Sequence, residues 1–277
     1  MVLIGTSGWN YQHWRGKFYP EQLSQRKWLE YFSTHFKTVE LNSSFYHIPK
    51  ESVTKSWFTR TPTSFSFSVK VTRLISHIHK LRECEDVIEW FFSSCRPLAP
   101  KIPVYLIQLP PSLCPDPETL TDFIPVLVEK AHKHTDNNPD KKSKLRFSME
   151  IRNKKCDIEK IASILEEYNI SLCLHDYGGK FNYTIGELPT DSGEKQTKNQ
   201  QITPPQIPYI TADFVYIRFH GYGKRYGGCY PEEFLREWAK QIKEWDSKGL
   251  DVFAYFNNDF EGYAIENARS LIGMVGV

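Results

Sequence analysis

Charged side chains stand at the ends of short, β-rich runs along this sequence. Glu40, Lys70 and Glu150 each come at the end of such a run, and Arg218 and His220 close another. Carboxylates, an amine and an imidazole can exchange protons with a substrate, while a guanidinium group binds anions through paired hydrogen bonds. If the fold brings these ends together, the residue types predict acid/base chemistry on a polar or anionic substrate.

The spacing of the runs predicts how their ends meet. Eight runs recur roughly every 25 to 45 residues, and helix-like stretches follow most of them, as in a (β/α)₈ barrel. In that fold the carboxyl ends of the strands surround one active-site mouth. We therefore predict an α/β protein with a single TIM-barrel domain over residues 1–277. Its expected strands are 3–5, 38–41, 65–69, 104–109, 147–151, 171–174, 214–219 and 252–256.

Helical patterns fill most of the intervals between these runs. The clearest begins at Pro231, places Phe234, Trp238 and Ile242 on one apolar face, and is followed by Gly249 as a stop. Further helices are expected over residues 27–36, 51–59, 86–98, 118–132, 157–168 and 263–274. Residues 178–208 have no apolar period, so we predict an irregular insertion between strands 6 and 7, either a lid or a disordered segment.

Side-chain alternation predicts which strand residues face the barrel interior. In residues 65–70 the bulky side chains share one face, and Ser66, Ser68 and Lys70 share the other. The same alternation assigns to the polar face Glu40, Asn42, Ser148, Glu150, Arg152, Tyr216, Arg218 and His220. It does not decide between His175 and Asp176, nor among residues 257–259. Paired charges on this face have an alternative role, because ion pairs can serve only to close a barrel.

Two glycine-bearing loops follow the first and seventh runs. Residues 5–9 form either a tight turn or a loop whose backbone N–H groups bind an anion. Residues 221–230 mix glycines with Tyr222, Lys224 and Arg225, a combination that suits stacking and phosphate contacts or a lid over the core.

Composition narrows the classes of partner and compartment. The formal net charge is only +2, which gives no electrostatic support to a nucleic-acid partner, and no run is long and apolar enough for a membrane span. The six cysteines include no CxxC pair, so neither a zinc knuckle nor a redox motif is indicated. We expect a cytoplasmic protein with no cofactor and no obligatory metal.

Six motifs in order along the chain carry a family resemblance. They are GTSGW at 5–9, WRGKFYP at 14–20, VELNSSFY at 39–46, QLPPS at 108–112, YIRFHG at 216–221 and YFNND at 255–259. They resemble the YecE-like family, also called domain of unknown function 72, which implies a TIM barrel and supplies no established reaction. After Arg152 the family commonly has His-Pro-Ser-Trp, whereas this chain has Asn153-Lys154-Lys155-Cys156.

The resemblance completes the set of candidate site residues. We predict catalytic roles for Glu40, Lys70, Glu150, Asp176 and His220, with Lys70 and His220 transferring protons. We predict substrate contacts from Asn42, Tyr46, His77, Gln108, Arg152, Arg218, Tyr222, Asn257, Asn258 and Asp259, with the two arginines binding the anion.

Three functional hypotheses follow from these candidates. The first is an enzyme acting on a small polar or phosphorylated molecule. The second is a metal-dependent hydrolase or isomerase, analogous in fold to endonuclease IV and xylose isomerase, with metal among Glu150, Asp176, His220 and Asp259. The third is a non-catalytic barrel that binds a ligand or nucleic acid, supported only by the loop at 221–230.

Overall fold

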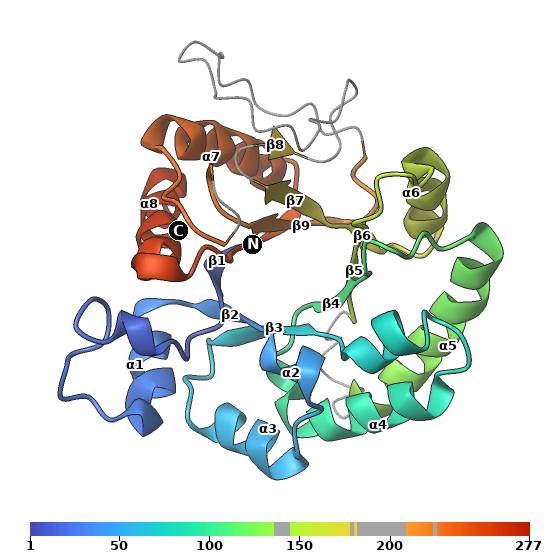
Figure 1. The fold of residues 1–277 in the computed structure, drawn as a ribbon, viewed down its shortest axis with the longest axis horizontal. Helices are drawn as coiled ribbons and strands as arrows, with labels where there is room; N and C mark the ends of the chain where they lie inside the picture. The colour runs from blue at the N-terminus through green and yellow to red at the C-terminus, as the bar shows by residue number, and fades with distance from the viewer. Residues whose placement is uncertain (136–144, 178–179, 182–208, 224–225) are drawn as a thin grey trace.

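The barrel predicted from the sequence is present in the computed structural model, which describes residues 1–135, 145–177, 180–181, 209–223 and 226–277. In this part of the chain nine parallel strands form a nearly closed barrel with helices around it (Figure 1). The sheet order is β6-β5-β4-β3-β2-β1-β10-β9-β7-β8. The strands are β1 (Val2–Ser7), β2 (Thr38–Leu41), β3 (Ser66–Lys70), β4 (Tyr105–Gln108), β5 (Phe147–Glu150), β6 (Ser171–Leu172), β7 (Leu174–Tyr177), β8 (Lys180–Phe181), β9 (Phe214–Phe219) and β10 (Asp251–Phe256).

The predicted sixth strand is divided into two short strands. β6 pairs with β5, while β7 pairs with β9, so this stretch joins the two halves of the barrel. The backbone N–H of Cys173, between them, still donates to the carbonyl of Met149 at 2.9 Å. β8 adds to β7 in the antiparallel direction, which the sequence did not predict. The rest of the expected insertion at 178–208 lies outside the described residues.

All the described α-helices except α2 follow predicted ranges closely. The α-helices are α1 (Trp28–His35), α2 (Ser43–Tyr46), α3 (Glu51–Thr59), α4 (Glu85–Cys95), α5 (Pro117–Thr135), α6 (Ile158–Glu167), α7 (Glu232–Ser247) and α8 (Tyr263–Val275). The helix expected to reach residue 98 ends at Cys95 and continues as a 3₁₀ turn, η4 (Arg96–Lys101). Pro97 and Pro100 explain this ending, because proline has no N–H to extend an α-helix.

Two short elements beyond β2 and β3 were missed by the sequence analysis. They are α2 and a π-helical turn, η3 (Leu74–Ile78). Both are shorter than the windows in which helical periodicity can be recognised. They carry Phe45 and His77, whose rings contact each other with centroids 4.9 Å apart.

The barrel interior is packed with its own apolar cluster, separate from the layer between strands and helices. Its members are Leu3, Val104, Leu106, Cys173, Phe214, Tyr216, Phe253 and Tyr255. Close strand approach requires glycine at position 5, because a Cβ there would lie 2.4 Å from the carbonyl oxygen of Thr38. Because this apolar cluster fills the barrel interior, the charged side chains that face inward lie near the carboxyl ends of the strands.

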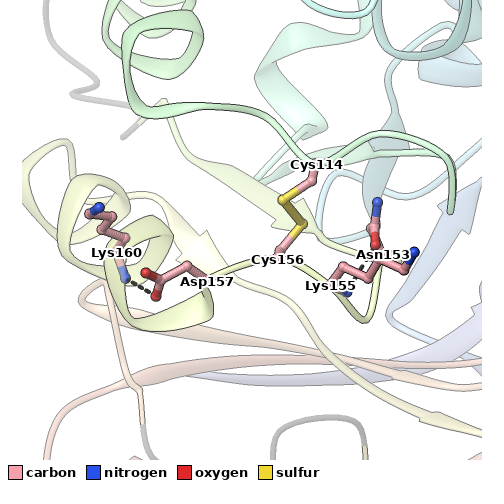
Figure 2. Close-up of a disulfide and its surroundings, with 6 residues drawn as sticks. All are labelled: Cys114, Asn153, Lys155, Cys156, Asp157 and Lys160. Atoms are coloured by element: carbon pink, nitrogen blue, oxygen red, sulfur yellow. Dashed lines mark hydrogen bonds between the residues drawn. A yellow bond between two sulfur atoms is a disulfide. The ribbon is translucent and has the colours of Figure 1, made fainter.

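A disulfide joins two of the loops at those carboxyl ends. Cys114, between β4 and α5, is bonded to Cys156, between β5 and α6 (Figure 2). Their separation of 42 residues matches no short motif, which is why the spacing of the cysteines did not reveal the pair. Such bonds are rare in cytosolic proteins, so the cytoplasmic location stays a prediction. Within the described ranges, every helix is too short or too polar to cross a membrane.

Candidate functional site

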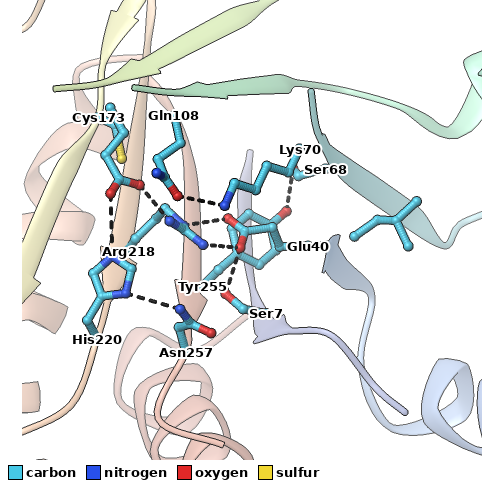
Figure 3. A network of polar contacts seen from close by, with 12 residues as sticks. Ser7, Glu40, Ser68, Lys70, Gln108, Cys173, Arg218, His220, Tyr255 and Asn257 are labelled. Carbon is cyan, nitrogen blue, oxygen red and sulfur yellow. Dashed lines mark hydrogen bonds and ion pairs between the residues drawn. The ribbon is translucent and has the colours of Figure 1, made fainter. Parts of the chain in front are cut away.

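A buried carboxylate, Glu40 at the end of β2, lies at the centre of a polar network in the barrel (Figure 3). Its Oε1 accepts from Ser7 Oγ at 2.7 Å and from Arg218 Nη2 at 2.7 Å. Its Oε2 accepts from Tyr216 Oη at 2.8 Å and from Arg218 Nε at 2.9 Å. These bonds confirm the alternation that placed Glu40, Tyr216 and Arg218 on one face. They also make the Arg218 contact bidentate, which fixes the guanidinium plane.

Arg218 links Glu40 to a second buried carboxylate, Glu150. Arg218 Nη1 donates to Glu150 Oε2 at 2.5 Å, and Arg152 Nε donates to Glu150 Oε1. Burial alone would raise the pKa of Glu150, but the guanidinium groups of Arg152 and Arg218 hold it well below its usual range. Burial likewise opposes the charge of Arg218, yet the two carboxylates raise its pKa well above the ordinary value. The network therefore contains charges that stay fixed at neutral pH.

Lys70, at the end of β3, brings an amine to this network (Figure 3). Its Nζ donates to Gln108 Oε1 at 2.6 Å and lies 3.7 Å from the ring centroid of Phe45, with 7% of the residue exposed. Burial, reinforced by the positive charge of Arg218, lowers the pKa of Lys70 to about 7. Both forms of this amine are consequently populated near neutral pH.

Lys101 shows what a structural buried lysine looks like in the same protein. Its Nζ donates to the carbonyls of Phe58, Thr61 and Pro62 and to Thr61 Oγ1, at 2.8 to 2.9 Å. Four oxygen acceptors satisfy that ammonium, whereas one protein oxygen faces the amine of Lys70 in the described chain. Lys70 is thus buried without the acceptors that would hold it charged.

Two histidines complete the site, and sequence reasoning assigned only one of them. His220 is fully buried, accepts at Nδ1 from the Asn257 amide at 3.1 Å, and has Nε2 3.7 Å from Glu150 Oε1. His175 stands beside Arg218 in the β7–β9 register, which puts it on the interior face. Burial lowers the pKa of His175 to about 4 and that of His220 well below its normal value, so both rings are neutral at physiological pH.

The side chain of Asp176, predicted to be catalytic, bonds to Tyr230, which is not one of the network residues described above. Asp176 is in register with Phe219, on the opposite face of the strand from Arg218. Its Oδ2 accepts from Tyr230 Oη, and the Tyr230 ring packs against Phe219 and Phe234. The strand alternation that draws His175 inward directs Asp176 toward the helix layer. The register thus places Asp176 on the face opposite Arg218, and its catalytic role stays a prediction.

The residues predicted after β10 divide in the same way. Asn257 bonds His220 as described, whereas Asn258 is fully buried and donates to Gly228 O and Asn267 Oδ1 at 2.8 and 2.9 Å. Asp259 uses its backbone carbonyl to accept from His13 Nε2 and Trp14 Nε1, both at 2.8 Å. Asn258 and Asp259 therefore tie loops together, and of the three residues only Asn257 bonds a network side chain within the described ranges.

The remaining predicted contacts surround the network at different depths. Gln108 accepts a hydrogen bond from Lys70, and the His77 ring packs on Phe45. Burial, and then the charge of Lys70, lowers the pKa of His77 to about 4. Tyr46 is 63% exposed, and Tyr222 packs against Tyr230 and Phe234. Asn42 Oδ1 is buried and finds no hydrogen-bond donor in the part of the chain that the structure describes. Lys224 and Arg225 of the aromatic loop lie outside that part.

The glycine loop after β1 is a turn closed on itself. Thr6 Oγ1 donates to the carbonyl of Gly8 at 2.7 Å, and Gly8 N donates back to the Thr6 carbonyl at 3.1 Å. Gly8 has a φ of +101°, a conformation open to glycine. These bonds match the turn interpretation of residues 5–9.

The proposed metal ligands are not gathered into one set. Glu150 and His220 share the network, while Asp176 contacts Tyr230 and Asp259 lies near His13. Across the described ranges, no three His, Cys, Asp or Glu side chains are grouped closely enough to hold a metal ion.

Comparison with known proteins agrees with this architecture. The family model described as "Protein of unknown function DUF72" matches residues 3–277. This chain belongs to the DUF72 family. Curated relatives include the UPF0759 protein YecE of Escherichia coli K12, 26% identical over 88% of this chain and 82% of YecE. The UPF0759 protein YunF of Bacillus subtilis 168 is 24% identical, with 100% and 95% of the two chains covered.

Solved DUF72 structures have the same fold. A DUF72 family protein of Thermotoga maritima MSB8 superposes with a TM-score of 0.75 at 24% identity, covering both chains fully. A DUF72 family protein of Enterococcus faecalis V583 gives 0.72 at 19% identity, covering 100% of this chain and 96% of that one. At such identities the likeness concerns the fold, and the chemistry has to be argued from the site.

Proposed function

We propose that this DUF72 protein is an enzyme that binds a small, polar, negatively charged molecule at the carboxyl end of the barrel and transfers a proton on it. The observation that carries the proposal is the burial of the Lys70 amine and its lowered pKa. Lys70 is a buried amine with a pKa of about 7, beside an array of fixed charges. An amine that gains and loses its proton near neutral pH can act as general base and general acid.

The other charged groups are assigned supporting roles. Glu40 is engaged by Ser7, Tyr216 and Arg218, and the pKa values of Glu150 and His220 lie well below their normal ranges. Groups that keep one protonation state at pH 7 stabilise charge rather than carry protons. We therefore assign electrostatic roles to Glu150 and His220, in place of the proton transfer predicted for His220. Glu40 orients Arg218 through its bidentate contact.

The charge balance supports an anionic substrate. Two glutamates and two arginines cancel within the network, so protonation of Lys70 leaves a positive excess. Arg218 is 1% exposed and committed to both glutamates, whereas the Arg152 side chain is 10% exposed. We therefore assign the anion contact to Arg152 rather than equally to both arginines, with phosphate or carboxylate as the group bound.

Hydrogen exchange in D₂O tests this function on many candidate substrates at once. Mixtures of phosphorylated and carboxylated sugars are incubated with the protein, and deuterium incorporation at carbon is followed by NMR. We expect the wild-type protein to exchange a proton of at least one compound, Lys70→Met to lose this exchange, and Arg152→Ala to weaken binding of the same compound about tenfold or more.

The matched control for Lys70→Met is Lys101→Met, which also removes a buried amine but lies outside the network. Exchange that survives in Lys70→Met, or that Lys101→Met abolishes equally in folded protein, would refute the assignment. Absence of exchange in the wild type across the mixtures would refute the proton-transfer function itself.

A further inference from the structure

A cavity of about 500 Å³ lies beside the network, between the loop after β1 and helices α1 and α3. Its volume falls within the usual range for small-molecule sites. The lining includes three aromatic side chains, Trp9, Tyr11 and Trp57. Around them are the amides of Asn10, Gln25 and Asn42 and the guanidinium groups of Arg26 and Arg60.

The amides offer both donors and acceptors to a ligand. Asn42 lines the cavity, but its Oδ1 is buried from solvent, so the groups that a ligand can reach are sought on Asn10 and Gln25. Asn10 accepts at Oδ1 from Gln25 Nε2 at 2.8 Å, and Gln25 Oε1 accepts from Gln12 Nε2 at 2.9 Å. This chain of bonds fixes the amides and leaves the N–H groups of Asn10 as donors. Hydroxyl groups, which donate and accept together, match such a lining.

The aromatic geometry favours a sugar over a flat base. Trp9 and Trp57 are perpendicular, with an interplanar angle of 89° and centroids 5.8 Å apart. This edge-to-face pair forms no parallel slot in which a nucleobase could be sandwiched. A saccharide ring instead lays its C–H face on one aromatic ring and bonds polar groups with its rim.

The charge of the lining distinguishes acidic from neutral sugars. Arg60 is neutralised by Glu30 through Nε and Nη2, at 3.1 and 2.8 Å. Arg26 is exposed and forms no ion pair with another described residue, and no carboxylate belongs to the lining. One guanidinium group is therefore available to an anionic substituent.

We propose that this cavity is a binding site for a saccharide ring that carries an acidic group. The site is distinct from the proton-transfer network and does not depend on that function. The two are adjacent, because Tyr11 Oη donates to the carbonyl of Ser7 at 2.5 Å and Ser7 Oγ donates to Glu40. Two residues, Tyr11 and Ser7, would thus lie between a bound ring and Glu40, the carboxylate that orients Arg218.

Isothermal titration of the full chain with glucose, glucuronate and inorganic phosphate tests the site. We expect glucuronate to bind more tightly than glucose, and Arg26→Ala to weaken glucuronate about three- to tenfold while glucose is unchanged. Trp57→Ala should weaken the binding of both sugars about tenfold, the usual cost of truncating an aromatic anchor in a binding site. The control Trp90→Ala removes a 55% exposed tryptophan on α4, outside the cavity, and should change neither.

Several outcomes would overturn the proposal. One is no binding of either sugar at millimolar concentration; another is phosphate binding as tightly as glucuronate with no effect of Arg26→Ala. Because Arg26 is exposed, this variant remains decisive even if Trp57→Ala does not fold. Lys70→Met should leave sugar binding unchanged. If Lys70→Met loses sugar binding while folded Trp57→Ala keeps it, the sugar binds at the barrel mouth. That result would refute the cavity as the binding site and would leave the proposed function intact.

Discussion

The two ends of the barrel are both closed by guanidinium–carboxylate pairs, but at different depths. At the amino end Arg146 Nη2 binds Asp251 Oδ2 at 2.5 Å, the Met1 ammonium binds Asp251 Oδ1 at 2.8 Å, and the Arg146 guanidinium lies over Phe214. The side chains of Arg146 and Asp251 remain 12% and 21% exposed. At the carboxyl end Arg218, Glu40 and Glu150 are 0 to 1% exposed.

This difference in burial is why the proposed site is assigned to the carboxyl end and not to the amino end. The partly hydrated ion pairs at the amino end lose little hydration free energy when the barrel closes, whereas removing three charges from water at the carboxyl end has a large desolvation penalty. The carboxyl end also holds Lys70 and two neutral histidines near those charges. Fixed charge kept away from water is what catalysis by electrostatic preorganisation requires.

The largest expected effect comes from removing the central guanidinium. Arg218→Met leaves Glu40 and Glu150 buried without their main partner, so the free energy of unfolding should fall by about 3–5 kcal/mol. Arg146→Met should cost about 1 kcal/mol, because Asp251 keeps the Met1 ammonium and contact with water. Urea unfolding of both variants at neutral pH measures the contrast. Equal losses of unfolding free energy in Arg218→Met and Arg146→Met would contradict the difference between the two ends of the barrel.

An intermediate effect is expected from Lys70→Met, and it depends on pH. The folded pKa of about 7 lies below the value of about 10.4 for an unfolded lysine, so between these values the unfolded chain binds the extra proton and wild-type stability rises with pH. Below pH 7 both states are protonated and the wild type bears the full cost of burial. Lys70→Met should therefore stabilise the protein most at pH 6, and this gain should shrink by roughly 1.4 kcal/mol per pH unit above 7.

Urea unfolding at pH 6 and pH 8.5 measures this trend. Lys101→Met serves as the control and should destabilise the protein at pH 6, because it strands the oxygens that now accept from Lys101. A difference between wild type and Lys70→Met that does not change with pH would contradict a titrating amine in the network.

The smallest effect is expected at the amino end. Burial opposes the charge of Asp251, but the Met1 ammonium and Arg146 lower its pKa below the ordinary value. A depressed carboxyl pKa stabilises the fold above the unfolded value of about 3.9, and this contribution is lost as pH falls through the folded pKa. Asp251→Asn should lower the free energy of unfolding by about 1 kcal/mol at pH 7, by less in high salt, and not at all in strong acid. A loss that persists in strong acid would assign Asp251 a different role.

Much of the site could be predicted because strand alternation is a local rule. The neighbours in sequence were enough to assign five residues to the polar face: Glu40, Lys70, Glu150, Arg218 and His220. In the structure Arg218 binds both Glu40 and Glu150. The choice between His175 and Asp176 needed the register of β7 on β9. No local pattern reveals that register, because the sixth strand is divided at Cys173.

The sequence by itself determined the barrel, the order of its main strands and helices, and the family, since repeated βα units and ordered motifs are encoded by neighbouring residues. Only the tertiary structure decided which charges are paired, which amine is left near its titration point, and where the cavity lies. Pairing, pKa and shape depend on burial among segments far apart in the chain, so they exist only once the barrel has closed.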